Sequence, residues 1–354
     1  MINVTFVAVI AIFLGLLFRW SFKALLREEW QVIASIPMSK KSPDTWRGLN
    51  LTAYGVILGG ATVAAVTVIL ILLSAVGIPV RMTIAAIGLL LTVCIPAAKV
   101  MAALVEKKPG TFTVAGAMFV GVLAAPPVVW GLGKMFGPFP DLTAPVSAIL
   151  AAPAVAYALG EGTGRLACIS FGCCYGKPLS ECSELTRKLL GSWTFVFSGK
   201  TKKIAYESGF DGVPVVPIQA MTAVVNTSVG LTGILLFLNS HYSAALILTF
   251  VVTQLWRVWS ETLRADYRGE GKISPYQIMS ALSILLVIGV AYVLPAEPGS
   301  GPLAPPDLTA GLVSLWDPEV ILFVQAVGVV TFLFYGRSTV TGSNMSFHVF
   351  QQRI

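Results

Sequence analysis

The chain has 354 residues, of which 56% are hydrophobic and only 12% are charged. Soluble domains carry about a quarter charged residues, so this composition excludes an ordinary soluble enzyme. The formal net charge is +7, but the apolar background indicates that the basic residues border a membrane, and no nucleic-acid partner is expected.

Nine apolar runs follow one another along the chain, and each is long enough to cross a bilayer core of roughly 30 Å. They predict an all-α polytopic membrane protein with about nine transmembrane helices. The first run lacks the basic start and the small-residue cleavage site of a signal peptide, so we retain it as a span. The predicted spans are residues 3–22, 50–77, 82–104, 112–132, 143–160, 217–238, 243–260, 275–294 and 318–336.

Two of the segments between spans are long. Residues 176–214 are polar and basic and predict a small extramembrane head region, in which VFSGKTKKIAYESG indicates a hairpin or loop. Residues 295–317 are rich in Pro and Gly and predict a connecting loop.

Nearly all Lys and Arg residues fall on one face of the predicted bundle. The positive-inside rule alone makes that face cytoplasmic. A basic face also attracts anionic lipid headgroups, by about 1 kcal/mol for each nearby Lys or Arg. The sequence leaves both orientations open.

The five cysteines do not predict a disulfide framework, because an odd number excludes complete internal pairing. Cys168, Cys173, Cys174 and Cys182 also lack the paired CxxC spacing of a structural zinc site. From spacing alone we expect no metal and no cofactor.

Polar groups gather in four patches at the ends of spans. The strongest candidate is Gly160–Pro178, GEGTGRLACISFGCCYGKP, because a charge such as Arg165 is costly to keep at the rim of a membrane bundle. In a later patch, Arg257, Glu261 and Arg264 have helical spacing, so Glu261 is expected to pair with either arginine. An interfacial ion-pair network that only anchors the helix would give the same pattern. The other two patches are Ala53-Tyr54-Gly55 and TVAGAMFVG at 113–121.

Taken in order, these patches resemble the motifs of the prolipoprotein diacylglyceryl transferase family over about residues 50–295. The matches are Tyr54-Gly55 to its early YG; Gly164-Arg165, Gly172, Gly176 and Pro178 to GRxGNFxNxExxGxP; Pro217 and Gln219 to HPxQLYE; Arg257, Glu261, Arg264 and Asp266 to RFxxEFxRxD; and Ser274 to Gln277 to the start of the last family span.

The chain departs from the family at several polar positions. The family's HGG motif falls on Ala115-Gly116-Ala117, its signature asparagine on Cys168, its signature glutamate on Cys173, and the histidine of HPxQLYE on Val216. The family's candidate base is therefore missing, since histidine is the usual proton acceptor near neutral pH.

The resemblance implies a domain organisation and a function. Residues 50–295 would form a seven-helix core, flanked by an extra span and basic loop at 1–49 and by a loop, an extra span and a tail at 296–354. The family moves the diacylglyceryl group of phosphatidylglycerol onto a lipobox cysteine thiol. By resemblance this chain is a transferase of the bacterial inner membrane, with phosphatidylglycerol or another anionic phospholipid as donor and a lipoprotein precursor as acceptor.

The resemblance also implies residue roles. Arg165 would hold the lipid headgroup and Arg257 the phosphate, since arginine grips phosphate through two donors and stays charged. Glu261 would orient an arginine or act as a base, and Tyr54 would hydrogen-bond a lipid oxygen. The positions implied for substrate binding are Arg264, Gly164, Gly172, Gly176, Gln219, Cys168 and Cys173.

Three alternatives stay open at this level. Cys168 or Cys173 beside Arg165 is either a reactive thiolate or a small buried apolar residue. The protein either uses a different acceptor or lipid-derived group, or binds phospholipid without chemistry. A transporter or channel ranks last, because it predicts ionisable residues within spans and only Lys99, near a span end, fits.

Overall fold

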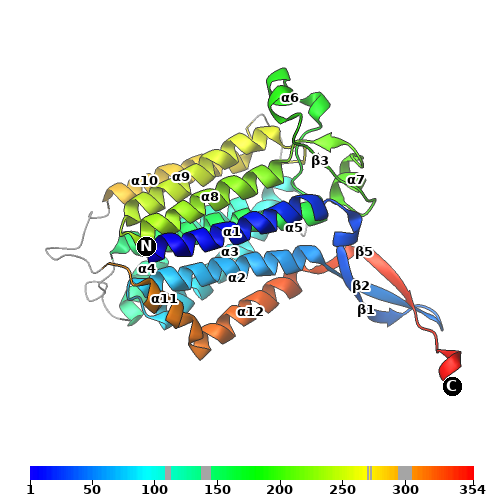
Figure 1. Cartoon of the computed structure of the whole chain (residues 1–354), viewed down its shortest axis with the longest axis horizontal. Coiled ribbons are helices and arrows are strands. Elements are labelled where there is room, and N and C mark those ends of the chain that lie inside the picture. Colours follow the sequence, from blue (N-terminus) through cyan, green and yellow to red (C-terminus); the bar gives the residue numbers. More distant parts are fainter. Residues whose placement is uncertain (108–112, 137–144, 269–270, 272, 294–304) are drawn as a thin grey trace.

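Figure 1 shows a computed structural model of the chain as a bundle of long helices that lie nearly side by side. The structure describes residues 1–107, 113–136, 145–268, 271, 273–293 and 305–354. Within these residues, nine helices are long and apolar enough to cross a membrane. This confirms the prediction of a polytopic, helical membrane protein. The nine are α1 (Ile2–Ala24), α2 (Ala53–Ala75), α3 (Val80–Glu106), α4 (Val114–Phe136), α5 (Val146–Phe171), α8 (Ile218–Leu238), α9 (Tyr242–Ser260), α10 (Pro275–Val293) and α12 (Pro318–Tyr335).

Most predicted spans agree with these helices to within about three residues, but the fifth does not. We predicted its end at residue 160, whereas α5 continues to Phe171 and ends where Gly172 takes a positive φ of 73°. The additional turns contain charged and polar residues. Because the spans were predicted from runs of apolar residues, the prediction ended before the first charge, whereas the helix continues. Arg165 and Cys168 therefore lie on a helix rather than in a loop.

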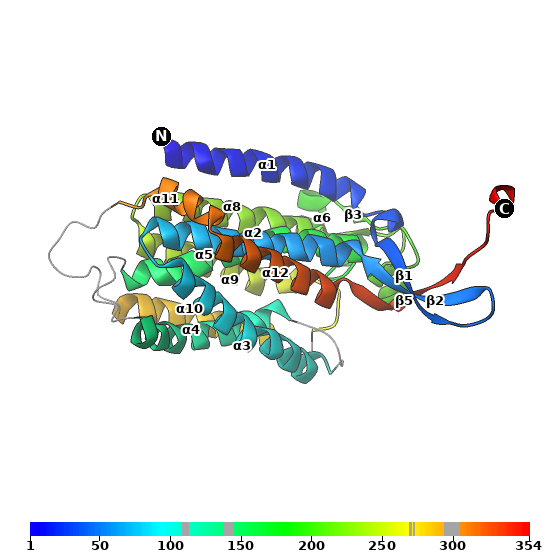
Figure 2. The same cartoon turned by 90° about the horizontal axis from the view of Figure 1, so that it is seen from below.

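Helix α5 is the centre of the bundle. Of its most apolar 18-residue window, 61% is buried inside the protein, compared with 6% for α1 and for α12. It packs against α2, α8 and α9, and small residues allow this, because a Cβ on Gly162 would lie 2.4 Å from Oγ1 of Thr227 on α8. Figure 2 shows α1 on one outer side of the bundle and α3, α4 and α10 on the other.

The segment predicted as a basic loop near 23–49 instead forms a β-hairpin of β1 (Val32–Lys40) and β2 (Thr45–Thr52). Strand β5 (Arg337–Ser346), from the C-terminal tail, pairs antiparallel with β2 to give the order β1-β2-β5. The Asn50 side chain connects the strands, because it accepts a hydrogen bond from the Ser35 hydroxyl and donates to the Thr341 carbonyl. The hairpin that follows α1 and the strand that follows α12 therefore meet in one sheet, which projects from the end of the bundle opposite the N-terminus (Figure 1).

The head region lies at the same end of the bundle (Figure 1). Where we expected a hairpin or loop, β3 (Phe195–Val196) pairs with β4 (Pro214–Val215), and α7 (Lys203–Ser208) lies between them. A further short helix, α6 (Glu184–Leu190), precedes them. Lys202 is fully buried and donates to the carbonyls of Leu25 and Ser170 at 2.9 and 2.5 Å, which ties the head to the ends of α1 and α5. Burial lowers the pKa of Lys202 to about 8.

The Pro/Gly-rich segment is only partly a connecting loop. Residues 295–304 of the predicted loop lie outside the described residues. Further along, Leu308–Val313 form the short helix α11, whose first turn is capped by the Asp307 side chain. Gly311 of α11 packs against the backbone of Ile71 on α2.

The contact between α2 and Gly336, which lies between α12 and β5, gives a stability prediction. A Cβ on Gly55 would lie 2.2 Å from Cα of Gly336, so Gly55→Ala should force the two segments apart and lower the free energy of unfolding by about 1–3 kcal/mol. Gly60, on the same helix, has nothing within 4 Å, and Gly60→Ala should leave stability unchanged or raise it by up to about 1 kcal/mol. Melting temperatures in detergent compare the two variants, and equal values would contradict the packing argument.

Candidate active site

The centre of the site is one carboxylate held between two arginines. Glu161 and Arg165 lie one turn apart on α5, and Arg257 reaches them from α9. Glu161 accepts a hydrogen bond from Arg165 Nη2 at 2.5 Å and others from Arg257 and from the Tyr157 hydroxyl. The Glu161, Arg257 and Arg165 side chains are only 4%, 8% and 12% exposed. Burial of this kind requires pairing, because an isolated charge in a membrane bundle is costly.

This central group carries one more positive charge than negative. The Nε atoms of Arg165 and Arg257 are buried and have no hydrogen-bond partner within the described residues. Unpaired buried donors are costly. The two guanidiniums therefore keep donor capacity for an anion.

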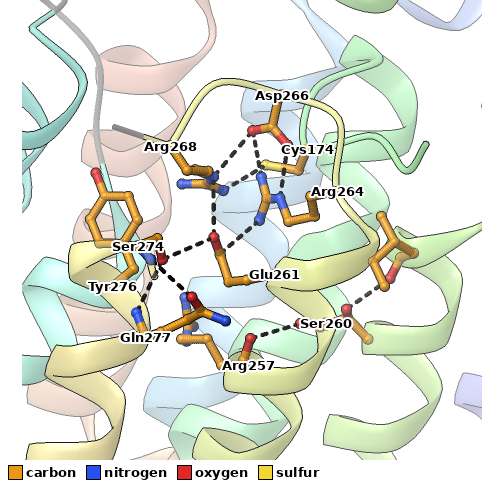
Figure 3. Close-up of polar contacts among 12 residues, drawn as sticks. Cys174, Arg257, Ser260, Glu261, Arg264, Asp266, Arg268, Ser274, Tyr276 and Gln277 are labelled. Atoms are coloured by element: carbon orange, nitrogen blue, oxygen red, sulfur yellow. Dashed lines mark hydrogen bonds and ion pairs between the residues drawn. The ribbon is translucent and has the colours of Figure 1, made fainter. Parts of the chain in front are cut away.

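A second ion-pair network lies just beyond the end of α9 (Figure 3). Arg264 donates to both carboxylate oxygens of Asp266 at 2.8 and 2.7 Å, and its Nη1 lies 3.7 Å from Glu261. Arg268 lies 3.2 Å from Asp266 and 3.3 Å from Glu106 of α3. This network fixes the loop after α9 against α3.

Backbone pairing brings the two distant motifs of the sequence together. Gly176 forms an antiparallel bridge with Arg264, and the amide of Lys177 donates to the Leu263 carbonyl at 2.9 Å. The chain that leaves α5 therefore runs beside the chain that leaves α9. This pairing places Cys174 next to the arginines of the second motif.

A small pocket opens between the two networks. Three arginines, two carboxylates and several neutral polar groups face it. The lining residues are Glu161, Arg165, Cys174, Ile218, Gln219, Thr222, Asn226, Thr253, Trp256, Arg257, Ser260, Glu261 and Arg264.

A separate, apolar cavity of about 340 Å³ is lined by residues of α2, α3, α4, α5, α9 and α10. Tyr157 lines this cavity, and its hydroxyl bonds Glu161 of the polar pocket. The hydrogen bond from Tyr157 to Glu161 therefore links the lining of the apolar cavity to the lining of the polar pocket.

Five residues predicted from the sequence line the pocket together: Arg165, Arg257, Glu261, Arg264 and Gln219. Tyr54 does not line it. The Tyr54 ring packs edge-on against Phe171 with centroids 5.8 Å apart, on the side of α5 that carries the cysteines.

The predicted glycines shape the backbone. Gly172 ends α5 in the left-handed region, which favours glycine. Gly176 allows the chain to pass Val216, because a Cβ there would lie 2.4 Å from the Val216 carbonyl oxygen. Gly164 faces Leu58 at ordinary contact distance.

The cysteines gather although their spacing in the sequence favoured no metal site. The sulfur atoms of Cys168, Cys173 and Cys174 all lie within 4.8 Å of one another. Cys174 lines the pocket, whereas Cys168 and Cys173 do not. Gln219 donates to the Cys173 carbonyl at 2.9 Å and so connects α8 to this turn.

Two sequence interpretations need correction. Of the two arginines expected to pair with Glu261, Arg264 does so at 3.7 Å, whereas Arg257 pairs with Glu161 of α5 instead. Ionisable residues also do lie within candidate spans. Glu161 and Arg165 are on α5 and Arg257 is on α9, whereas Lys99 is on α3.

Sequence reasoning missed Glu161 and Tyr157. The position of Glu161, four residues before Arg165, is the signal that would have found it, since residues at this spacing face each other on a helix. Tyr157 precedes Glu161 by the same spacing. Arg268, Glu106 and Cys174 belong to the site only because the chain folds back there.

The fold and the site define a polytopic membrane protein with a buried, arginine-lined pocket near one end of its helices. Residues 44–293 match the family described as prolipoprotein diacylglyceryl transferase, and the chain belongs to this family of transferases of lipoprotein biosynthesis. The match runs from the hairpin turn before β2 to the end of α10, so α1, α12 and β5 lie outside it. A comparison with curated proteins finds no match.

The shared carboxylate gives a second stability prediction. Glu161→Gln leaves two buried arginines without their counter-charge, so it should lower the free energy of unfolding by about 3–5 kcal/mol. The matched control is Glu184→Gln in the head, where the pair with Lys188 is about three-quarters exposed and is worth at most about 1 kcal/mol. Denaturant unfolding in detergent measures both. A Glu161 variant as stable as the control would show that the arginines do not depend on this carboxylate.

Proposed function

We propose that this protein transfers a diacylglyceryl group from an anionic phospholipid such as phosphatidylglycerol to a thiol, which in this family belongs to the cysteine of a lipoprotein precursor. The observation that carries the proposal is that Arg165 and Arg257, from different helices, share one carboxylate and line the same buried pocket. Family membership supports the reaction class.

The chemistry needs a place for negative charge. A thiolate sulfur attacks the glyceryl carbon, the bond from that carbon to the phosphate oxygen breaks, and glycerol-1-phosphate leaves with the electron pair. Positive groups fixed in place beforehand stabilise the charge that grows on the leaving phosphate. Arg257 would contact this phosphate, Arg165 the headgroup, and Arg264 would support them. Glu161 is a positioning residue that holds both guanidiniums.

The apolar cavity supports a diacyl donor. It lies beside α5, and Tyr157 in its lining bonds Glu161 of the polar pocket. A phospholipid has the same arrangement, with acyl chains next to a charged headgroup. The chains would occupy the space between α3, α4 and α10 while the phosphate faces the arginines.

The chief difference from the family pattern is the missing histidine, which is the family's candidate base. His241 precedes α9 at the end opposite Arg257, and His348 follows β5 in the tail. Neither is among the described residues that line the pocket. Glu261 lines the pocket and is 5% exposed, so it is the carboxylate that we assign to proton transfer or to orienting Arg264.

The proposed location is the bacterial inner membrane, with the helices as multiple spans. The site lies at the end of the bundle that carries the head and the sheet (Figure 1).

A second candidate function is phospholipid binding without transfer, which the missing histidine favours.

Turnover in phosphatidylglycerol liposomes tests the proposal. Wild-type protein with a lipobox peptide should release glycerol-1-phosphate, and Arg165→Ala and Arg257→Ala should each lower the rate at least about 100-fold. Arg81→Ala is the control, because Arg81 is 77% exposed and pairs with Glu319 outside the site.

Three other results would change the assignment. Release without peptide would indicate another acceptor. Lipid binding without release would establish the non-catalytic function. Unchanged rates in both arginine variants would contradict the assigned site.

A further inference from the structure

The cluster of Cys168, Cys173 and Cys174 is the feature of the site that the proposed reaction does not yet use. Cys168 lies in the last turn of α5, and Cys173 and Cys174 follow its end. The chain reverses sharply there, because Gly172 and Cys174 both have positive φ, 73° and 55°. This reversal brings all three sulfur atoms within 4.8 Å of one another.

The spacing of the sulfurs suits a metal ion. Zinc–sulfur bonds are about 2.3 Å long, so two thiolates on one tetrahedral zinc lie roughly 3.8 Å apart. Sulfur atoms within 4.8 Å reach that separation by shifts of about 1 Å or less. Three cysteines also leave one of the four tetrahedral positions open, as catalytic zinc sites do.

The surrounding charges suit the complex as well. Three thiolates and one divalent ion carry a net charge of −1. Arg268 Nη2 lies 4.0 Å from the Cys174 sulfur, and Arg264 and Arg165 also act electrostatically on Cys174. The cluster therefore lies among cations that stabilise an anionic thiolate–metal complex.

We propose that Cys168, Cys173 and Cys174 bind one thiophilic divalent ion, Zn²⁺ or an equivalent, through three thiolates, and that the open fourth position accepts the acceptor thiol. The assignment of the fourth position to the acceptor thiol rests on the proposed function. Cys174 lines the pocket that holds Arg165 and Arg257, so a thiol on this ion stands beside the phosphate site.

This ion supplies what the absent histidine would have done. Zinc binding releases three protons from the cysteine thiols, and coordination of the acceptor thiol releases a fourth to solvent, because a coordinated thiol is deprotonated. The acceptor sulfur then attacks the glyceryl carbon as a thiolate. The carbon–oxygen bond breaks, and the phosphate takes the electron pair. No redox step is involved.

Metal binding is tested without lipid. Detergent-purified full-length protein is reduced, stripped with a chelator and titrated with Co²⁺, whose thiolate charge-transfer absorption reports sulfur ligands. Wild type and Cys182→Ser should bind one equivalent. Cys168→Ser, Cys173→Ser and Cys174→Ser should each weaken binding at least tenfold. Cys182 is the matched control, because its thiol lies outside the cluster and donates a hydrogen bond to the Pro178 carbonyl.

A second measurement uses only wild type and does not depend on the variants folding. Zn²⁺ should protect Cys168, Cys173 and Cys174 from alkylation and leave the reactivity of Cys94 and Cys182 unchanged, as mapped by mass spectrometry. Failure of wild type to bind Co²⁺, or protection spread equally over all five cysteines, overturns the site.

A third experiment separates the role of the metal ion from the transfer reaction itself. Stripped wild-type protein should turn over phosphatidylglycerol at least tenfold more slowly than the Zn²⁺-reloaded protein. Equal turnover in both would retain the proposed function and overturn the role of the ion. Stoichiometric metal with no turnover in either state would retain the metal site and overturn both the transferase function and the ion's role in it.

Discussion

The structure of the site depends on the buried contact of Glu161 with Arg165 and Arg257. Two guanidiniums that converge within a helical bundle repel one another, and one carboxylate between them removes most of that cost. Because Glu161 and Arg165 are on α5 and Arg257 is on α9, the contact also fixes the spacing of these helices at the pocket. One excess positive charge remains, and with it unpaired guanidinium donors that suit an anionic ligand.

The chain around this contact explains why the site lies where it does. Helix α5 is the most buried of the candidate spans among the described residues, and it ends at Gly172 with the cysteine turn. The strand-like segment after it pairs with the chain that leaves α9. The pocket therefore forms where two central helices end, close to the apolar cavity that reaches Tyr157. The lipid substrate proposed for this site needs such a combination of charged groups and a nearby apolar space.

The departures from the family pattern follow a common theme. Histidine, asparagine and glutamate positions of the family are occupied here by alanine, valine and cysteine, and the two cysteines at those positions, Cys168 and Cys173, lie close to Cys174. A thiol acceptor must lose its proton before it can attack, and either a carboxylate or a thiolate-bound ion provides for this. The roles assigned to Glu261 and to the cysteine cluster are thus distinct answers to one chemical requirement.

The sequence by itself determined the membrane class, the number of candidate spans and most of the pocket's arginines, because apolar run length and isolated charges are local properties. It also indicated the family through the order of its motifs. Only the tertiary structure decided that Glu161 is the partner of Arg257, that α5 continues past residue 160, and that β5 pairs with β2 across the length of the chain. It also decided that Cys168, Cys173 and Cys174 converge. These features depend on which segments the packing brings together, and neither spacing nor composition along the chain encodes that.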